Sequence, residues 1–141
     1  MDSKRAFQGS YPKPGNNSKN RGSSSNISRR RKAIKLHLLN MGDKCAVCGI
    51  SLSNGFHLHE AIITRGMIRG VKRLKGEIFV VENCVGVCGE CHVDAHTTEG
   101  RKKCAQHLVR REGKDNIVKW LDNMQSMMKS TTLINECRSL L

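Results

Sequence analysis

Two pairs of cysteines are the residues whose types and spacing point most clearly to chemistry. Two residues separate Cys45 from Cys48, and two separate Cys88 from Cys91. A CxxC turn places two thiolates on one knuckle, and two knuckles together supply the four ligands of a tetrahedral structural zinc ion. The 39 residues between the pairs (49–87) exceed the length of a simple zinc ribbon. The spacing therefore predicts a substructure inserted between the two knuckles.

Two histidines follow the second cysteine pair directly. His92 comes immediately after Cys91, and His96 lies four residues further on. On a helix this separation places both imidazoles on one face, where they can ligate one ion. A structural metal would then anchor the segment that presents a catalytic divalent ion. The inserted segment carries further polar candidates, namely His57, His59, Glu60 and Asn83.

The other cysteines and the N-terminus indicate in which cellular compartment the protein is expected. Cys84, Cys104 and Cys137 have no CxxC partner, and we interpret them as core or surface thiols. Seven cysteines cannot all pair, and a chain with no apolar signal segment favours metal ligation over disulfides. No run of about 18 apolar residues is present, so we expect no membrane span and a cytoplasmic protein.

The elements that must position these residues give an α+β fold class. Apolar spacing places Ile34, Leu38 and Met41 on one stripe of a helix that Gly42 would end. The remaining elements follow from apolar runs, β-branched residues and capping residues. They are strands within 56–63 and 78–87, a basic loop over 64–76, a short helix from about Gly89, helices over 101–112 and 115–128, and one or two helical turns in 131–141.

The distribution of charge suggests a polyanionic partner. The net charge is +13, and residues 1–41 carry ten Lys or Arg against one acid. Residues 1–26 are rich in Gly, Ser, Asn, Lys and Arg, so we predict a flexible basic tail before a single domain at 27–141. A basic arm of this kind is typical of nucleic-acid binding, with a solubilising tail as the alternative. The first predicted helix adds Arg29, Arg30 and Arg31.

The order of these motifs resembles the HNH nucleases, and most closely their zinc-knuckle form. The match covers about residues 45–96 and consists of Cys45-x2-Cys48, His59, Asn83 and Cys88-x2-Cys91-His92-x3-His96. The segments around Leu58-His59-Glu60 and Glu82-Asn83-Cys84 are also similar to HNH proteins of phage and mobile elements. The resemblance implies a zinc-stapled ββα-metal core at 45–97, flanked by helices, with a C-terminal helical extension at 99–141.

The same resemblance implies a metal-dependent endonuclease that hydrolyses DNA phosphodiester bonds by nicking or double-strand cleavage. His59 would be the general base, and Asn83 would orient it by a hydrogen bond. His92 and His96 would hold a catalytic divalent cation (Mg²⁺, Mn²⁺, Ni²⁺ or Zn²⁺) against the scissile phosphate. Basic residues of the inserted segment would contact flanking phosphates, namely Arg65, Arg69, Lys72 and Arg73. The host would be a bacterial or phage-infected cell.

One position departs from the family pattern. The family usually has a metal ligand directly before the basic histidine, where this chain has Leu58. Either His59 becomes the ligand and Glu60 the base, or His57 supplies the ligand from the same strand face as His59. The same departure leaves open a non-catalytic, zinc-stabilised DNA-binding or regulatory protein with the HNH fold. A zinc-stabilised RNA-binding or phage assembly factor is a further alternative.

Overall fold

The first described element is a basic helix. The computed structural model describes residues 24–128 and 131–141, so most of the predicted tail lies outside the described residues. Helix α2 spans Ser24–Asn40 and thus includes the last three residues assigned to that tail. Ile34 and Leu38 are fully buried as predicted, whereas Met41 follows the helix and is 37% exposed. Gly42 ends the helix with φ 70°, a conformation that glycine adopts without strain.

The sheet consists of two short antiparallel strands. Strand β1 spans His57–Glu60 and β2 spans Cys84–Val87, with His57 opposite Val87 and His59 opposite Val85. Both are shorter than the apolar runs that predicted them. Residues 62 and 63 leave the ladder because the side chain of the buried Asn83 binds their backbone. The sheet is therefore limited to four residues in each strand, with His57 and His59 in β1.

Four 3₁₀ turns fill the segments that connect and follow the strands. The predicted basic loop contains η2 (Arg65–Ile68) and η3 (Lys72–Leu74). The segment expected to form one short helix is instead two turns, η4 (Gly89–Cys91) and η5 (Asp94–His96). Tight i to i+3 bonds from Cys91 N to Cys88 O and from His96 N to Val93 O close these turns.

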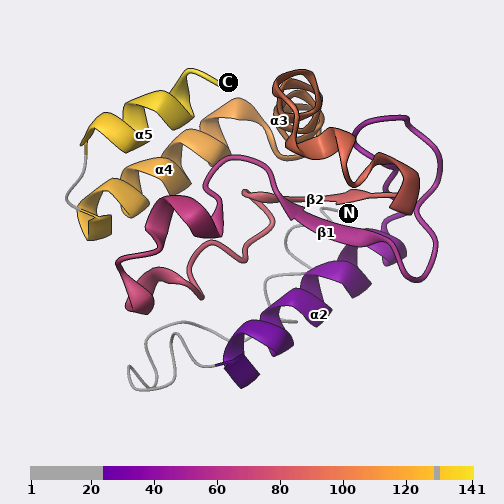
Figure 1. Ribbon diagram of the computed structural model, residues 1–141, viewed down its shortest axis with the longest axis horizontal. Helices are drawn as coiled ribbons and strands as arrows, with labels where there is room; N and C mark the ends of the chain where they lie inside the picture. Colours follow the sequence, from indigo (N-terminus) through magenta and orange to yellow (C-terminus); the bar gives the residue numbers. More distant parts are fainter. Residues whose placement is uncertain (1–23, 129–130) are drawn as a thin grey trace.

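Three helices form the C-terminal part. Helix α3 spans Thr98–Glu112, α4 spans Lys114–Met128 and α5 spans Thr131–Arg138. The sheet lies between α2 and α3, while α4 packs on α3 and α5 packs on α4 (Figure 1). Gly113, at φ 85°, turns the chain between α3 and α4 where the sequence predicted a helix end. This α+β arrangement agrees with the predicted fold class.

One hydrophobic core serves the whole described chain. Its buried side chains come from four helices and both strands, and include Ile34, Leu38, Val85, Val87, Ala105, Leu108, Ile117, Leu121 and Ile134. Among the described residues, no helix has the length and apolar character needed to cross a bilayer.

A buried ionic network joins three parts of the fold. Asp43, just after α2, accepts a bond from Arg111 of α3 at 3.1 Å and lies 3.0 Å from His107 Nε2. Arg111 also donates to the carbonyl oxygens of Val81 and Cys84, at the start of β2. The network therefore holds α3 against both the first cysteine knuckle and the second strand.

Candidate functional site

The four cysteines of the two CxxC motifs come together in space. Their sulfur atoms all lie within 4.8 Å of one another, so the cluster could hold a metal ion. The Cys48 and Cys88 sulfurs are 3.8 Å apart. A tetrahedral zinc–thiolate site with Zn–S bonds of about 2.3 Å requires sulfur separations of about 3.8 Å. The predicted knuckle arrangement is thus present in the described chain.

The environment of the cluster favours thiolate at one of its members. Burial by itself would raise the pKa of Cys45, but the backbone N–H groups of Cys48, Cys88 and Val47 bond to its sulfur and lower the pKa to about 6. The Cys88 N–H to Cys45 Sγ distance is 3.4 Å. Such N–H···S bonds stabilise the deprotonated ligand that a metal needs.

The three cysteines outside the cluster behave differently. Cys84, Cys104 and Cys137 are all buried. Burial raises the pKa of Cys84 and of Cys104 to about 12 and that of Cys137 to about 11. These residues are therefore neutral thiols of the core, one of the two environments expected from the sequence.

Four histidines form a contiguous group beside the cysteine cluster. His57 and His59 project from the same face of β1, as expected. The His57 ring stacks on His92 with centroids 4.2 Å apart, and the His59 ring meets His96 edge-on at 4.9 Å. His92 and His96 are 5.4 Å apart. The fold thus brings the sequence-predicted histidines together from β1 and from the segment that contains η4 and η5.

A cavity of about 300 Å³ opens between His59 and His96. Glu60 also lines it, and Arg65 Nε donates to the Glu60 carboxylate at 3.0 Å. Glu60 is 8% exposed, so the ion pair is largely withdrawn from solvent on the carboxylate side. The cavity therefore contains a buried imidazole, an exposed imidazole and a carboxylate that an arginine already neutralises.

The protonation state of His59 follows from its surroundings. Burial, and then the neighbouring His96 and His92, lower the pKa of His59 to about 4, while the nearby Glu60 opposes the shift. Burial together with His57 and His96 also lowers the pKa of His92. At neutral pH His59 is therefore an uncharged imidazole with a free lone pair, the state that accepts a proton or binds a metal.

Asn83 does not bond to the His59 ring, and the expected hydrogen bond between them is corrected. The fully buried amide oxygen accepts the N–H groups of Ile62 and Ile63, at 3.0 and 2.8 Å. The amide nitrogen donates to the carbonyl oxygens of Ile63 and Ile78. These four bonds fix the backbone that follows β1. Asn83 therefore acts on the loop behind His59 and Glu60.

The position of His96 depends on close packing at the start of α3. Thr97 caps this helix, since its hydroxyl accepts the Gly100 N–H at 3.0 Å and donates to Asp94 O at 2.7 Å. A Cβ atom at Gly100 would lie only 1.7 Å from Asp94 O. The absence of a side chain at Gly100 is thus what allows α3 to approach the turn that carries His96.

The predicted phosphate-binding residues divide into three groups. Arg30 is corrected: it is 1% exposed and its guanidinium donates to the Gly76 carbonyl, so it is a structural residue. Arg29 and Lys72 are exposed, and Arg73 is exposed with a hydrogen bond to Met127 O. Arg31, Arg65 and Arg69 line a basic cleft.

The sequence analysis assigned no phosphate-binding role to three further cations of that cleft, Lys32, Lys35 and Lys75. The helical spacing of Arg31, Lys32 and Lys35 could have indicated a shared face of α2, but not which segment packs opposite it. No family model, curated protein or solved structure was found to match this chain.

Proposed function

We propose that this protein is a metal-dependent endonuclease of the HNH type that hydrolyses DNA phosphodiester bonds. The observation that carries the proposal is the pairing of His59 with His96 at a cavity beside the four-cysteine cluster. The order of a histidine, an asparagine and two histidines between and after two CxxC motifs supports it. The excess of basic residues supports a nucleic acid as the substrate.

In this proposal the ion at the four cysteines is zinc, and its role is structural. Four thiolates leave no open coordination position for a substrate, which is typical of a structural site. The cluster holds Cys91 in place, and His92 is the next residue. Thiolate ligation also suits a reducing compartment, so the enzyme would act in the cytoplasm of a bacterial or phage-infected cell.

The chemistry assigned to the histidines follows from their geometry. The buried, neutral His59 accepts the proton of a water molecule that attacks the phosphorus atom. His92, directly after η4, and His96, in η5, would hold a divalent cation. The cation, when bound, would stabilise the charge on the pentacoordinate phosphate and on the leaving oxygen. Asn83 keeps the backbone after β1 rigid, which fixes His59 relative to the cavity.

The contacts favour His59 over Glu60 as the base. The Glu60 carboxylate accepts a hydrogen bond from Arg65 Nε at 3.0 Å, so a role as base would require this ion pair to break. His57 stacks on His92 and is the candidate for an additional ligand. Comparing nicking rates of His59→Ala, Glu60→Gln and His57→Ala tests this order. We expect the largest loss in His59→Ala, and a larger loss in Glu60→Gln would reverse the assignment.

A non-catalytic nucleic-acid-binding protein is the second candidate function. It is favoured by Leu58, which is 5% exposed and belongs to the hydrophobic core where the family usually has a metal ligand. Zinc binding and DNA binding are common to both candidates. Only the second candidate predicts that His59→Ala changes neither the binding of DNA nor its cleavage.

A further inference from the structure

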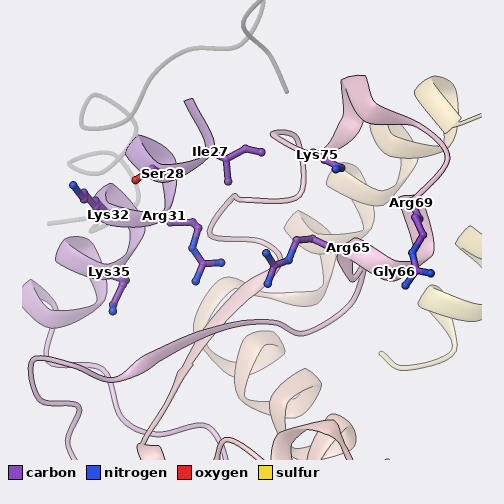
Figure 2. Close-up of a pocket in the computed structure, with 9 residues that line it drawn as sticks. All are labelled: Ile27, Ser28, Arg31, Lys32, Lys35, Arg65, Gly66, Arg69 and Lys75. Atoms are coloured by element: carbon purple, nitrogen blue, oxygen red, sulfur yellow. The ribbon is translucent and has the colours of Figure 1, made fainter. Parts of the chain in front are cut away.

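A basic cleft of about 630 Å³ lies between α2 and the segment that contains η2 and η3. One wall carries Arg31, Lys32 and Lys35, and the other carries Arg65, Arg69 and Lys75, as Figure 2 shows. The described lining residues include no Asp or Glu. Six cations around one hollow repel one another, an arrangement that favours an anionic ligand.

The Arg31 guanidinium contacts an aromatic ring, while one of its nitrogens has no hydrogen-bond partner among the described residues. The guanidinium lies over the Phe79 ring, 5.3 Å from the centroid. Its buried Nη1 atom has no hydrogen-bond partner in the part of the chain that the structure describes. In Figure 2 the guanidinium groups of Arg31 and Arg65 point toward each other from opposite walls. A phosphate group between the two arginines would offer acceptor oxygens to both guanidinium groups.

The cleft adjoins the histidine cavity. Arg65 and Gly66 line both hollows, and the Arg65 Nε atom is bound to Glu60 on the cavity side. The ion pair orients the Arg65 side chain and leaves its two terminal nitrogens for other acceptors. The two hollows therefore share a wall at Arg65 and Gly66.

We propose that Arg31 and Arg65 clamp one backbone phosphate of the DNA strand, immediately beside the phosphate that reaches His59. This inference rests on the proposed function, which it deepens by naming the substrate requirement. The preferred substrate is a polynucleotide that carries a charged linkage next to the one that is cut. Planar guanidinium groups suit this role because each can form two parallel bonds to phosphate oxygens.

The test measures binding separately from cleavage. A short fluorescein-labelled duplex is titrated with zinc-loaded full-length protein, without added divalent ion, between about 50 and 200 mM salt. The Arg31→Gln variant is expected to bind about tenfold more weakly, with a salt slope lower by about 1. Lys119→Gln is the matched control, because Lys119 is exposed on α4 outside the cleft. It is expected to behave as wild type.

A single neutral methylphosphonate, moved along the duplex, identifies the contact. At one position the methylphosphonate should weaken DNA binding by the wild-type protein, yet it should cause no further loss of binding in Arg31→Gln. Additive losses at every position would overturn the clamp, as would equal binding by Arg31→Gln and wild type. If the clamp is found but the wild-type protein cuts no DNA with any added ion, the nuclease proposal fails independently. Cutting without a methylphosphonate position coupled to Arg31 refutes only the clamp.

Discussion

At the scale of single residues, burial decides what His59 can do. The side chain is 5% exposed and faces His96, so its protonated form is disfavoured by lost hydration and by a neighbouring imidazole. A neutral imidazole is available as a proton acceptor across the neutral range. Glu60, the adjacent carboxylate, is instead occupied by Arg65. Two neighbouring residues of one strand thus have different chemical states because their partners differ.

The lowered pKa of His59 makes stability depend on pH in a defined window. The unfolded chain takes up a proton near the ordinary pKa of 6.5, whereas folded His59 does so only near 4. Stability is therefore lost as pH falls from 6.5 to 4, by at most about 3 kcal/mol, and does not change for this reason above 6.5. Denaturant unfolding of His59→Gln, without added divalent ion, should show a shallower fall than wild type.

Cysteine protonation at acid pH affects both proteins, so the difference between their curves isolates His59. Parallel curves between pH 6.5 and 4 would show that burial does not shift this histidine.

At the scale of elements, the two knuckles and the turns after them form one unit. Cys45 and Cys48 precede the inserted segment, while Cys88 and Cys91 follow β2, so a bound metal would close a long loop. Binding free energy at such a site contributes to folding, because the unfolded chain does not preform it. The histidine turns depend on this closure, since they begin at the second cysteine pair.

Replacing Cys88 should remove both metal and stability. We expect Cys88→Ser to retain well under one zinc per chain and to unfold at a markedly lower temperature, as measured by metal analysis and thermal denaturation. Cys104→Ala is the control: its thiol is buried in the core outside the cluster, so its zinc content should equal that of wild type. Full zinc retention in Cys88→Ser would remove this residue from the ligand set.

Close packing at Gly100 provides a second test at this scale. An alanine there must push α3 away from Asp94, since its Cβ would lie 1.7 Å from the Asp94 oxygen. We expect Gly100→Ala to lose about 1–3 kcal/mol of stability and to shift the His96 ring resonances in an NMR spectrum. Gly70→Ala is the control, because a Cβ at Gly70 has no heavy atom within 4 Å among the described residues. Unchanged His96 resonances would contradict the account.

The elements themselves were only partly predictable from the sequence. Periodicity located α2, α3 and α4, because their apolar stripes face one core. It overestimated both strands, since a β-branched run does not reveal that Asn83 binds the backbone of residues 62 and 63. The helix expected at His92 and His96 was wrong for a related reason. The local sequence does not show that two cysteines of this segment must face the first knuckle, which the tight η4 and η5 turns allow.

At the scale of the whole molecule, long-range ion pairs hold the site together. The Cys45 knuckle, β2 and α3 converge on the buried pair of Asp43 and Arg111, whose side chains are 9% and 5% exposed. No sequence pattern predicted this network, because His107 has no partner nearby in the chain. Its contact with Asp43 spans 64 residues, which local patterns do not report.

Removing the Asp43 charge should destabilise the whole fold. Asp43→Asn removes one of the two carboxylates that pair with the buried Arg111 guanidinium, since Glu112 remains bound at 2.8 Å, and we expect a loss of about 2 kcal/mol in denaturant unfolding. Asp122→Asn is the matched control because Asp122 is 59% exposed and pairs with Arg138 near the surface. Its loss should stay below about 1 kcal/mol. Equal losses of stability in the two variants would show that the buried network stabilises the fold no more than a surface ion pair does.

The most direct test of the account is plasmid nicking by the purified protein, with and without added Mg²⁺, Mn²⁺ or Ni²⁺. The account predicts relaxed or linear DNA that requires an added ion and disappears in His59→Ala, while the variant keeps its zinc and still binds DNA. The Lys119→Gln protein should cut as wild type does. Intact supercoiled plasmid with every ion, together with DNA binding that His59→Ala leaves unchanged, would contradict the nuclease and leave a zinc-stabilised DNA-binding protein.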